Sequence, residues 1–133
     1  MSLTPRRPSG YLNRPDYRVD LLRRPNQVVA QIDGIVLAES NRAILVDEQD
    51  HALAVYFPRE DVAMDRLVAV EGKTTHCPYK GDAGYFALAG GDGEPIAWSY
   101  PQPYHEVAAI ADYIAFHQDR VAVALGSPAS TNA

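Results

Sequence analysis

Cysteine is almost missing from this sequence, and the little there is excludes two common ways of holding a small protein together. Cys77 is the one cysteine among 133 residues, so the chain can form neither an internal disulfide nor a multi-cysteine zinc site. The four histidines show no metal-ligand spacing; they are His51, His76, His105 and His117. We therefore expect a protein without a metal ion or any other cofactor.

Long apolar runs are also missing. No run approaches the ~20 residues that a membrane-spanning helix needs. Residues 1–10 hold two arginines and no apolar core, so they do not resemble a secretory signal. Hydrophobic residues make up 47% and charged residues 22%, as in ordinary globular proteins. We expect a cytoplasmic protein of one domain that does not enter a membrane.

The net charge of −5 conceals an uneven distribution. Residues 1–24 hold six arginines and two aspartates, a charge of +4, and the remainder holds six basic and fifteen acidic residues, a charge of −9. A basic arm can bind phosphate backbones, but the acidic body argues against nucleic acid as the main partner. We interpret residues 1–16 as a flexible basic arm, 17–125 as a single β-rich domain and 126–133 as a disordered tail.

Short apolar runs separated by turn residues predict a mainly β fold of antiparallel meander strands with one or two short helices. Asp33-Gly34 lies between two such runs and predicts a tight hairpin, because both central residues of that turn need positive φ. The helices are expected after Pro58 and over 106–111, and a closing hairpin is expected around Gln118-Asp119. Extended segments are expected at 28–32, 35–38, 43–47, 52–57, 68–75, 84–89, 96–100, 113–116 and 121–125.

The segment Tyr56-Phe57-Pro58-Arg59-Glu60-Asp61 is the first that could carry chemistry. Arg59 follows a proline that ends a strand, and its guanidinium fork suits a carboxylate or a phosphate. The alternative is an ordinary surface salt bridge to a neighbouring acid, which adds little stability.

The second is Thr75-His76-Cys77-Pro78-Tyr79-Lys80-Gly81. In an extended chain Thr75 and Cys77 share a face while His76 points away, so His76 is a poor base for the thiol. Lys80 could lower the pKa of the thiol if the loop folds back over it. Cys77 is a candidate catalytic nucleophile, against the alternative of a small buried side chain beside a structural turn. Thr75 and Lys80 are candidates for binding a ligand.

The third is Trp98-Ser99-Tyr100-Pro101. Trp98 and Tyr100 would share one face of a strand and form a flat wall with polar tips, as in small-molecule pockets. The alternative is that both pack in the core. The candidate ligand-binding residues are thus Tyr56, Arg59, Thr75, Lys80, Trp98 and Tyr100.

Several segments taken in order resemble a known family, from about Tyr17 to Leu125. The chain is similar to the domain of unknown function family 427 (DUF427), and only the arm and the tail lie outside the resemblance. The segments are Gly34-x-x-Leu37-Ala38-Glu39-Ser40, Tyr56 to Val62, Thr75 to Ala83, Trp98 to Pro101 and Ile110-x-x-Tyr113-Ile114-Ala115-Phe116.

The resemblance implies a single β-tent-like domain, similar in outline to methionine sulfoxide reductase B and the thalidomide-binding domain of cereblon. Many members of that wider fold carry a zinc site built from two CxxC pairs. This chain lacks those cysteines, so neither zinc nor reductase chemistry carries over.

The family has sometimes been labelled nucleotidyltransferase-like, but no carboxylate pair with metal-binding spacing stands beside a Gly-Ser element here. Two positions depart from the family pattern. Asp112 stands where glycine is common, and His117 where tyrosine is common. Both bear on the closing hairpin more than on the central site.

Two hypotheses about function come from different classes. The first is a small-molecule-binding domain that could also be an enzyme, with Trp98 and Tyr100 as walls and Thr75, Lys80 and Arg59 as polar anchors. Two cations near aromatic surface favour an anionic or planar polar ligand. The second is a non-enzymatic module that recognises a peptide or partner protein in the same cleft.

A third possibility is a redox or acyl-transfer enzyme that uses Cys77.

The site proposed from the sequence requires that the fold brings Cys77, Trp98 and Arg59 around one shared hollow. The sequence decides neither catalysis nor the oligomeric state.

Overall fold

The structure is a computed structural model, and it describes residues 8–23 and 25–125. The described chain forms ten strands in two antiparallel sheets and four short 3-10 turns, which confirms the prediction of a mainly β protein. No helix among these residues is long and apolar enough to cross a membrane.

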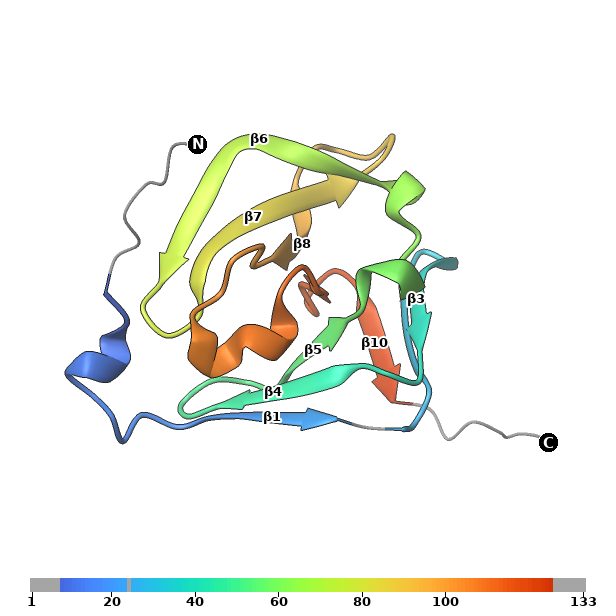
Figure 1. Ribbon diagram of the computed structural model, residues 1–133. Coiled ribbons are helices and arrows are strands. Elements are labelled where there is room, and N and C mark those ends of the chain that lie inside the picture. Colours follow the sequence, from blue (N-terminus) through green and yellow to red (C-terminus); the bar gives the residue numbers. More distant parts are fainter. Residues whose placement is uncertain (1–7, 24, 126–133) are drawn as a thin grey trace.

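The larger sheet has seven strands and curls around one side of the molecule (Figure 1). Strands β1 and β4 lie at the bottom of that view, and β6 and β7 arch over the top. In their order across the sheet, the strands are β1 (Val19–Arg23), β4 (Ile44–Glu48), β5 (Ala54–Phe57), β9 (Ile114–Phe116), β8 (Pro95–Ser99), β7 (Gly81–Leu88) and β6 (Leu67–Cys77).

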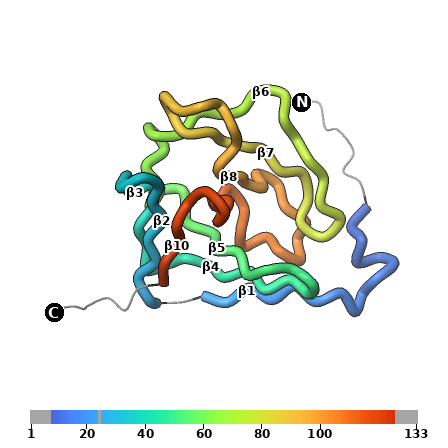
Figure 2. Tube along the Cα trace, turned by 180° about the vertical axis from the view of Figure 1, so that it is seen from behind, coloured from blue at the N-terminus to red at the C-terminus, as the bar shows by residue number. Residues whose placement is uncertain are grey.

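The smaller sheet has three strands and stands along one edge of the molecule, as Figure 2 shows from behind. Its order is β10 (Ala122–Leu125), β2 (Val28–Ile32) and β3 (Ile35–Ser40). The hairpin predicted at Asp33-Gly34 is confirmed, because Ile32 pairs with Ile35 and the two turn residues have φ of 50° and 81°. The 3-10 turns are η1 (Gly10–Leu12), η2 (Arg59–Asp61), η3 (Met64–Arg66) and η4 (His105–Ile110).

The predicted closing hairpin is wrong. Strand β9 pairs with β5 and β8 in the large sheet, whereas β10 pairs with β2 in the small one. The chain also changes sheet between β3 and β4, which do not pair with each other. Strand β1, which the sequence did not predict, forms an edge of the large sheet beside β4.

The large sheet separates two apolar clusters. Along β5, Tyr56 belongs to one cluster and Phe57 to the other, because successive side chains of a strand point to opposite faces. Phe57 packs with residues of both sheets, including Val28. Tyr56 lies on the inner side of the curl, where η4 (orange in Figure 1) contributes Val107 and Ile110. This inner side carries the candidate site.

The segment predicted as a flexible arm is described from residue 8 onward. Its η1 turn rests on the loop between β6 and β7, where the Gly10 amide donates a hydrogen bond to the Pro78 carbonyl oxygen at 2.8 Å. The Tyr17 ring stacks on Tyr79 with centroids 3.6 Å apart, and Tyr11 packs edge-on against both. Residues 1–7 and the predicted tail, 126–133, lie outside the described residues.

Candidate functional site

A hollow of about 690 Å³ opens on the inner side of the large sheet. Its lining comes from the turn between β4 and β5, the turn between β6 and β7, and the ends of β8 and β9. Aromatic side chains dominate its walls: Tyr17, Tyr56, Tyr79, Tyr85, Trp98, Tyr100 and Phe116. Four of the predicted ligand-binding residues and Cys77 border this one hollow; the four are Tyr56, Lys80, Trp98 and Tyr100.

Trp98 and Tyr56 hold each other in place at the back of the hollow. The indole N–H of Trp98 donates to the Tyr56 hydroxyl oxygen at 3.0 Å, and the two rings meet edge to face. The Tyr100 ring also lies beside Tyr56, with ring centroids 6.5 Å apart and planes 28° apart. Burial raises the pKa of both tyrosines, so their hydroxyl groups are neutral and can donate or accept hydrogen bonds.

Lys80 does not offer a free positive charge to the hollow. Its ammonium group contacts the carboxylate of Glu48, and both side chains are buried. Glu48 also accepts a hydrogen bond of 2.5 Å from the Tyr17 hydroxyl group. Burial alone would raise the pKa of Glu48, but the bonds from Lys80 and Tyr17 outweigh it and lower the pKa. Sequence reasoning missed Glu48, because its partner lies 32 residues away.

Cys77 is half-buried in the wall and carries a free thiol. It makes no hydrogen bond to any side chain that the structure describes, so no base contacts the sulfur in this state. The neighbouring His76 bonds instead to Asp82 on the paired strand, with Nδ1 and Oδ1 2.7 Å apart. This arrangement favours a wall residue over an activated nucleophile.

His117 borders the hollow, although the sequence assigned it to the closing hairpin. Its ring is parallel to Tyr85 within 8°, at a centroid distance of 6.2 Å, and it lies 4.8 Å from Trp98. Burial lowers the pKa of His117, so the ring is neutral at pH 7 and offers one donor and one acceptor. The signal available in the sequence was the histidine at a position where the family resemblance implies tyrosine. The sequence analysis related it to the closing hairpin and not to the site.

Thr75 and Arg59 stand apart from the other candidates. The Thr75 hydroxyl lies 2.7 Å from the Tyr85 hydroxyl, so Thr75 reaches the wall only through Tyr85. Arg59 does not border this hollow. Its guanidinium lies over the Phe86 ring at 5.7 Å, and the nearest carboxylate, that of Asp112, is 3.8 Å away. The expectation of Cys77, Trp98 and Arg59 around one hollow therefore holds for the first two and not for Arg59.

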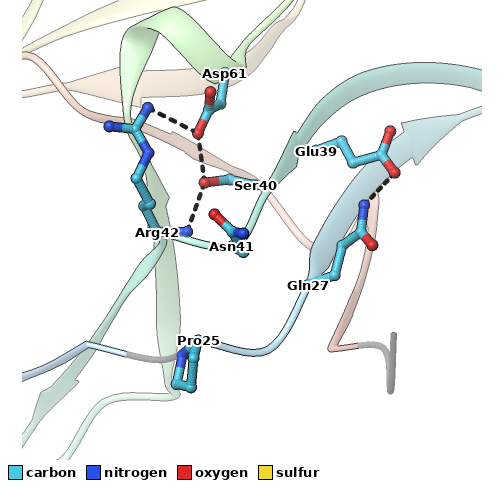
Figure 3. A pocket seen from close by; sticks show the side chains of 7 residues that line it. All are labelled: Pro25, Gln27, Glu39, Ser40, Asn41, Arg42 and Asp61. Carbon is cyan, nitrogen blue, oxygen red and sulfur yellow. Dashed lines mark hydrogen bonds and ion pairs between the residues drawn. The ribbon is translucent and has the colours of Figure 1, made fainter. Parts of the chain in front are cut away.

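A polar hollow of about 340 Å³ lies where the chain passes from β3 to β4 (Figure 3). Its charged groups already have partners: Arg42 pairs with Asp61, and Glu39 accepts a hydrogen bond from Gln27. Asp61 accepts hydrogen bonds from Ser40 at 2.6 Å and from Arg42 at 3.2 Å. Among the described residues, no three His, Cys, Asp or Glu side chains are grouped so that they could hold a metal ion.

The fold and the site define a small antiparallel β protein with one large aromatic-walled hollow. The model of the family described as Domain of unknown function (DUF427) matches residues 20–126, and the chain belongs to this family. The resemblance found in the sequence is thereby confirmed. No match was found among curated proteins.

Proposed function

We propose that the protein binds a small planar polar molecule in the large hollow. The observation that carries this proposal is a volume of about 690 Å³ lined by Tyr56, Trp98 and Tyr100. Ligand sites usually measure roughly 300–1,000 Å³ and combine apolar or aromatic walls with a few polar groups. A flat ring system would stack on such walls in an offset or edge-on arrangement.

The charges around the hollow favour a neutral ligand over an anion. Lys80 is neutralised by Glu48, and Arg59 lies elsewhere. An anion would have to compete with the buried carboxylate for Lys80, which would leave Glu48 without its partner. The neutral hydroxyl group of Tyr100 and the neutral ring of His117 are suited to a ligand with both donors and acceptors.

The test uses the position of the single tryptophan. A library of planar polar compounds is screened by thermal shift, and each positive compound is titrated against Trp98 fluorescence. A ligand at a hundredfold excess over its Kd stabilises the protein by about 2.7 kcal/mol. We expect at least one compound to raise the melting temperature and change the emission together.

A matched pair of variants assigns the site. Ala52 borders the hollow and is exposed, so Ala52→Phe fills space without removing a contact of the core. Ala124→Phe makes the same change at an exposed position of β10 outside the hollow. Binding should be lost in the first variant and kept in the second. Compounds that bind Ala52→Phe as well as the wild type, or a screen without any response, would overturn the proposal.

Two outcomes concern the other functions predicted from the sequence. Binding of peptides but not of small molecules, with the same loss in Ala52→Phe, would favour the interaction module. Alkylation of Cys77 tests catalysis: a rate that follows an ordinary thiol pKa of ~8.5, or a reaction only after unfolding, leaves Cys77 as a wall residue. The cytoplasmic location stays a prediction, and a small metabolite is a ligand compatible with it.

A further inference from the structure

A second hollow, of about 300 Å³, shares Tyr85 of its lining with the large hollow. Trp98 borders the large hollow and Ser99 borders the second one, as expected for neighbours in a strand. The second hollow is the one that contains Arg59. Its chemistry differs from that of the first hollow.

Three paired residues form a notch in its floor. Thr74 pairs with Gly84 across β6 and β7, and Gly84 pairs with Ser99 across β7 and β8. Their side-chain positions therefore share one face of the sheet, and the outer two stand two strand spacings apart, ~9.5 Å. A Cβ atom added to Gly84 would meet no atom within 4 Å, so the middle of this row is open.

An irregularity in β6 shapes the rim. The pairing register of β6 with β7 shifts between Ala69 and Thr74, and Gly72 within this stretch has φ of 76°. Such bulges redirect side chains and are common beside binding sites. Here the bulged stretch includes Lys73, whose ammonium group lies 4.9 Å from the centre of the Tyr85 ring.

Two cations border the second hollow without a hydrogen-bonded acid. The side chains of Arg59 and Lys73 make no hydrogen bond to any residue that the structure describes, and the Arg59–Asp112 ion pair is long, at 3.8 Å. Glu71 borders the hollow as well, but it forms no ion pair within the described part of the chain. Lys80 in the large hollow, by contrast, is fully engaged by Glu48.

Ser99 supplies an independent observation. It is 2% exposed, and its hydroxyl oxygen is the one buried side-chain polar atom among the described residues without a hydrogen-bond partner. About nine in ten buried polar groups have a partner, so an exception needs a reason. A ligand acceptor in the notch would supply the missing partner.

We infer that this second hollow binds a small oxyanion, the carboxylate or phosphate group of a small molecule. The guanidinium of Arg59 offers a planar fork of donors, Lys73 adds a point charge, and Ser99 and Thr74 add hydroxyl groups. Oxyanions are rich in acceptors, which matches the unused donors of Arg59, Lys73 and Ser99 at this site. The modest volume fits a small ligand.

The experiment uses sodium phosphate and sodium malonate as probes, each at constant ionic strength with chloride as the reference. Backbone amide shifts of Gly84 and Ser99 are followed by NMR. We expect saturable shifts with at least one probe, and a Kd at least tenfold weaker in Arg59→Gln. Arg66→Gln removes the same charge from an exposed position outside the hollow and should bind as the wild type does. Whichever probe binds identifies the oxyanion.

Two further variants test the geometry rather than the charge. Gly84→Val fills the notch and keeps both cations, so it should abolish saturable binding. Ser99→Ala should weaken binding but raise the melting temperature of the free protein, because it removes an unpaired buried hydroxyl group. Shifts that stay linear with concentration, or equal affinity in wild type, Arg59→Gln and Gly84→Val, would overturn the inference. Trp98 fluorescence reports the other hollow, so the two proposals can fail separately.

Discussion

The ammonium group of Lys80 contacts the carboxylate of Glu48 in the lining of the large hollow, and these side chains belong to residues only 7% and 6% exposed. Lys80 directly precedes β7, and Glu48 is the last residue of β4. The pair therefore joins the two sides of the hollow. Lys80, which the sequence suggested as a ligand anchor, thus has a buried carboxylate as its partner.

Removal of one member of this pair should be costly. Glu48→Gln leaves the ammonium group of Lys80 buried without a counter-charge, and breaking a buried pair in this way costs about 3–5 kcal/mol. We expect a loss of that size in urea unfolding. The double variant with Glu48→Gln and Lys80→Met should lose less stability than the sum of the losses measured in the two single variants. Additive losses would show that the two groups do not interact.

The same pair predicts a pH dependence. The pKa of Glu48 is lower in the folded protein than in the unfolded chain, so the carboxylate contributes stability that is fully present above the ordinary glutamate pKa. This contribution is lost as the pH falls through that value towards the lowered pKa of the folded state. Stability measured from pH 7 to pH 3 should fall less steeply in Glu48→Gln than in the wild type. Parallel curves would contradict the assignment.

Local features of the fold were predictable, and the pairing of distant strands was not. Asp33-Gly34 specifies its hairpin within two residues, because the turn requires backbone angles that few residues adopt. Gln118-Asp119 also looked like a hairpin turn, yet β9 is completely buried between β5 and β8 while β10 lies at a sheet edge. Which partner a strand takes depends on the whole core and not on its connecting turn.

The candidate site was predictable where residues lie on regular strands. Alternation placed Trp98 and Tyr100 on one face, and both border the hollow. Arg59 follows the end of β5, where η2 turns the chain and no alternation applies, so its direction could not be inferred. Glu48 and His117 were missed because their roles come from contacts with residues far away in the sequence.

The hydrogen bond between Trp98 and Tyr56 should be measurable as a coupling. Trp98→Phe leaves the buried Tyr56 hydroxyl group without its donor, which costs about 1–3 kcal/mol in addition to the lost apolar contact. In Tyr56→Phe the indole N–H loses its acceptor. The double variant should therefore be about 1 kcal/mol more stable than the sum of the single losses indicates. Urea unfolding of the four proteins measures this coupling, and strict additivity would refute it.

His117 should titrate below the ordinary histidine range. Because burial lowers the pKa in the folded protein, the unfolded chain takes up the proton more readily. Stability should fall as the pH drops through the unfolded pKa of about 6.5 and become level below the folded pKa. NMR titration of the imidazole measures the folded value directly. His117→Tyr, which introduces the residue that the family resemblance implies at this position, should remove this component, and a titration at or above 6.5 would contradict it.

Gly10 of the N-terminal segment lies directly against the β6–β7 loop. A Cβ atom there would lie 2.8 Å from the Tyr79 ring, which cannot move freely because it is stacked on Tyr17. Gly10→Ala should cost about 1–3 kcal/mol, the usual range for overpacking. We expect faster amide hydrogen exchange in residues 10–17 and unchanged exchange rates in the two sheets. Gly84→Ala is the control, since its Cβ would enter open space; equal exchange in both variants would exclude a close contact at Gly10.

Asp112 adopts a backbone conformation that favours glycine, the residue that the family resemblance implies at this position. Its φ is 62°, in the left-handed region, where a Cβ atom is sterically disfavoured. Its one ion pair, to Arg59, is long and exposed and adds little.

Asp112→Gly should therefore raise the free energy of unfolding by about 0.5–1 kcal/mol, despite the greater freedom of glycine in the unfolded chain. Asp112→Ala is the matched control, because it removes the same carboxylate but keeps the Cβ atom. Alanine also adopts the left-handed conformation less readily than aspartate, whose short polar side chain can hydrogen-bond locally. We expect Asp112→Ala to be less stable than the wild type. If both variants change stability equally, the effect comes from the carboxylate and its pairing with Arg59, and backbone strain at Asp112 has no part in it.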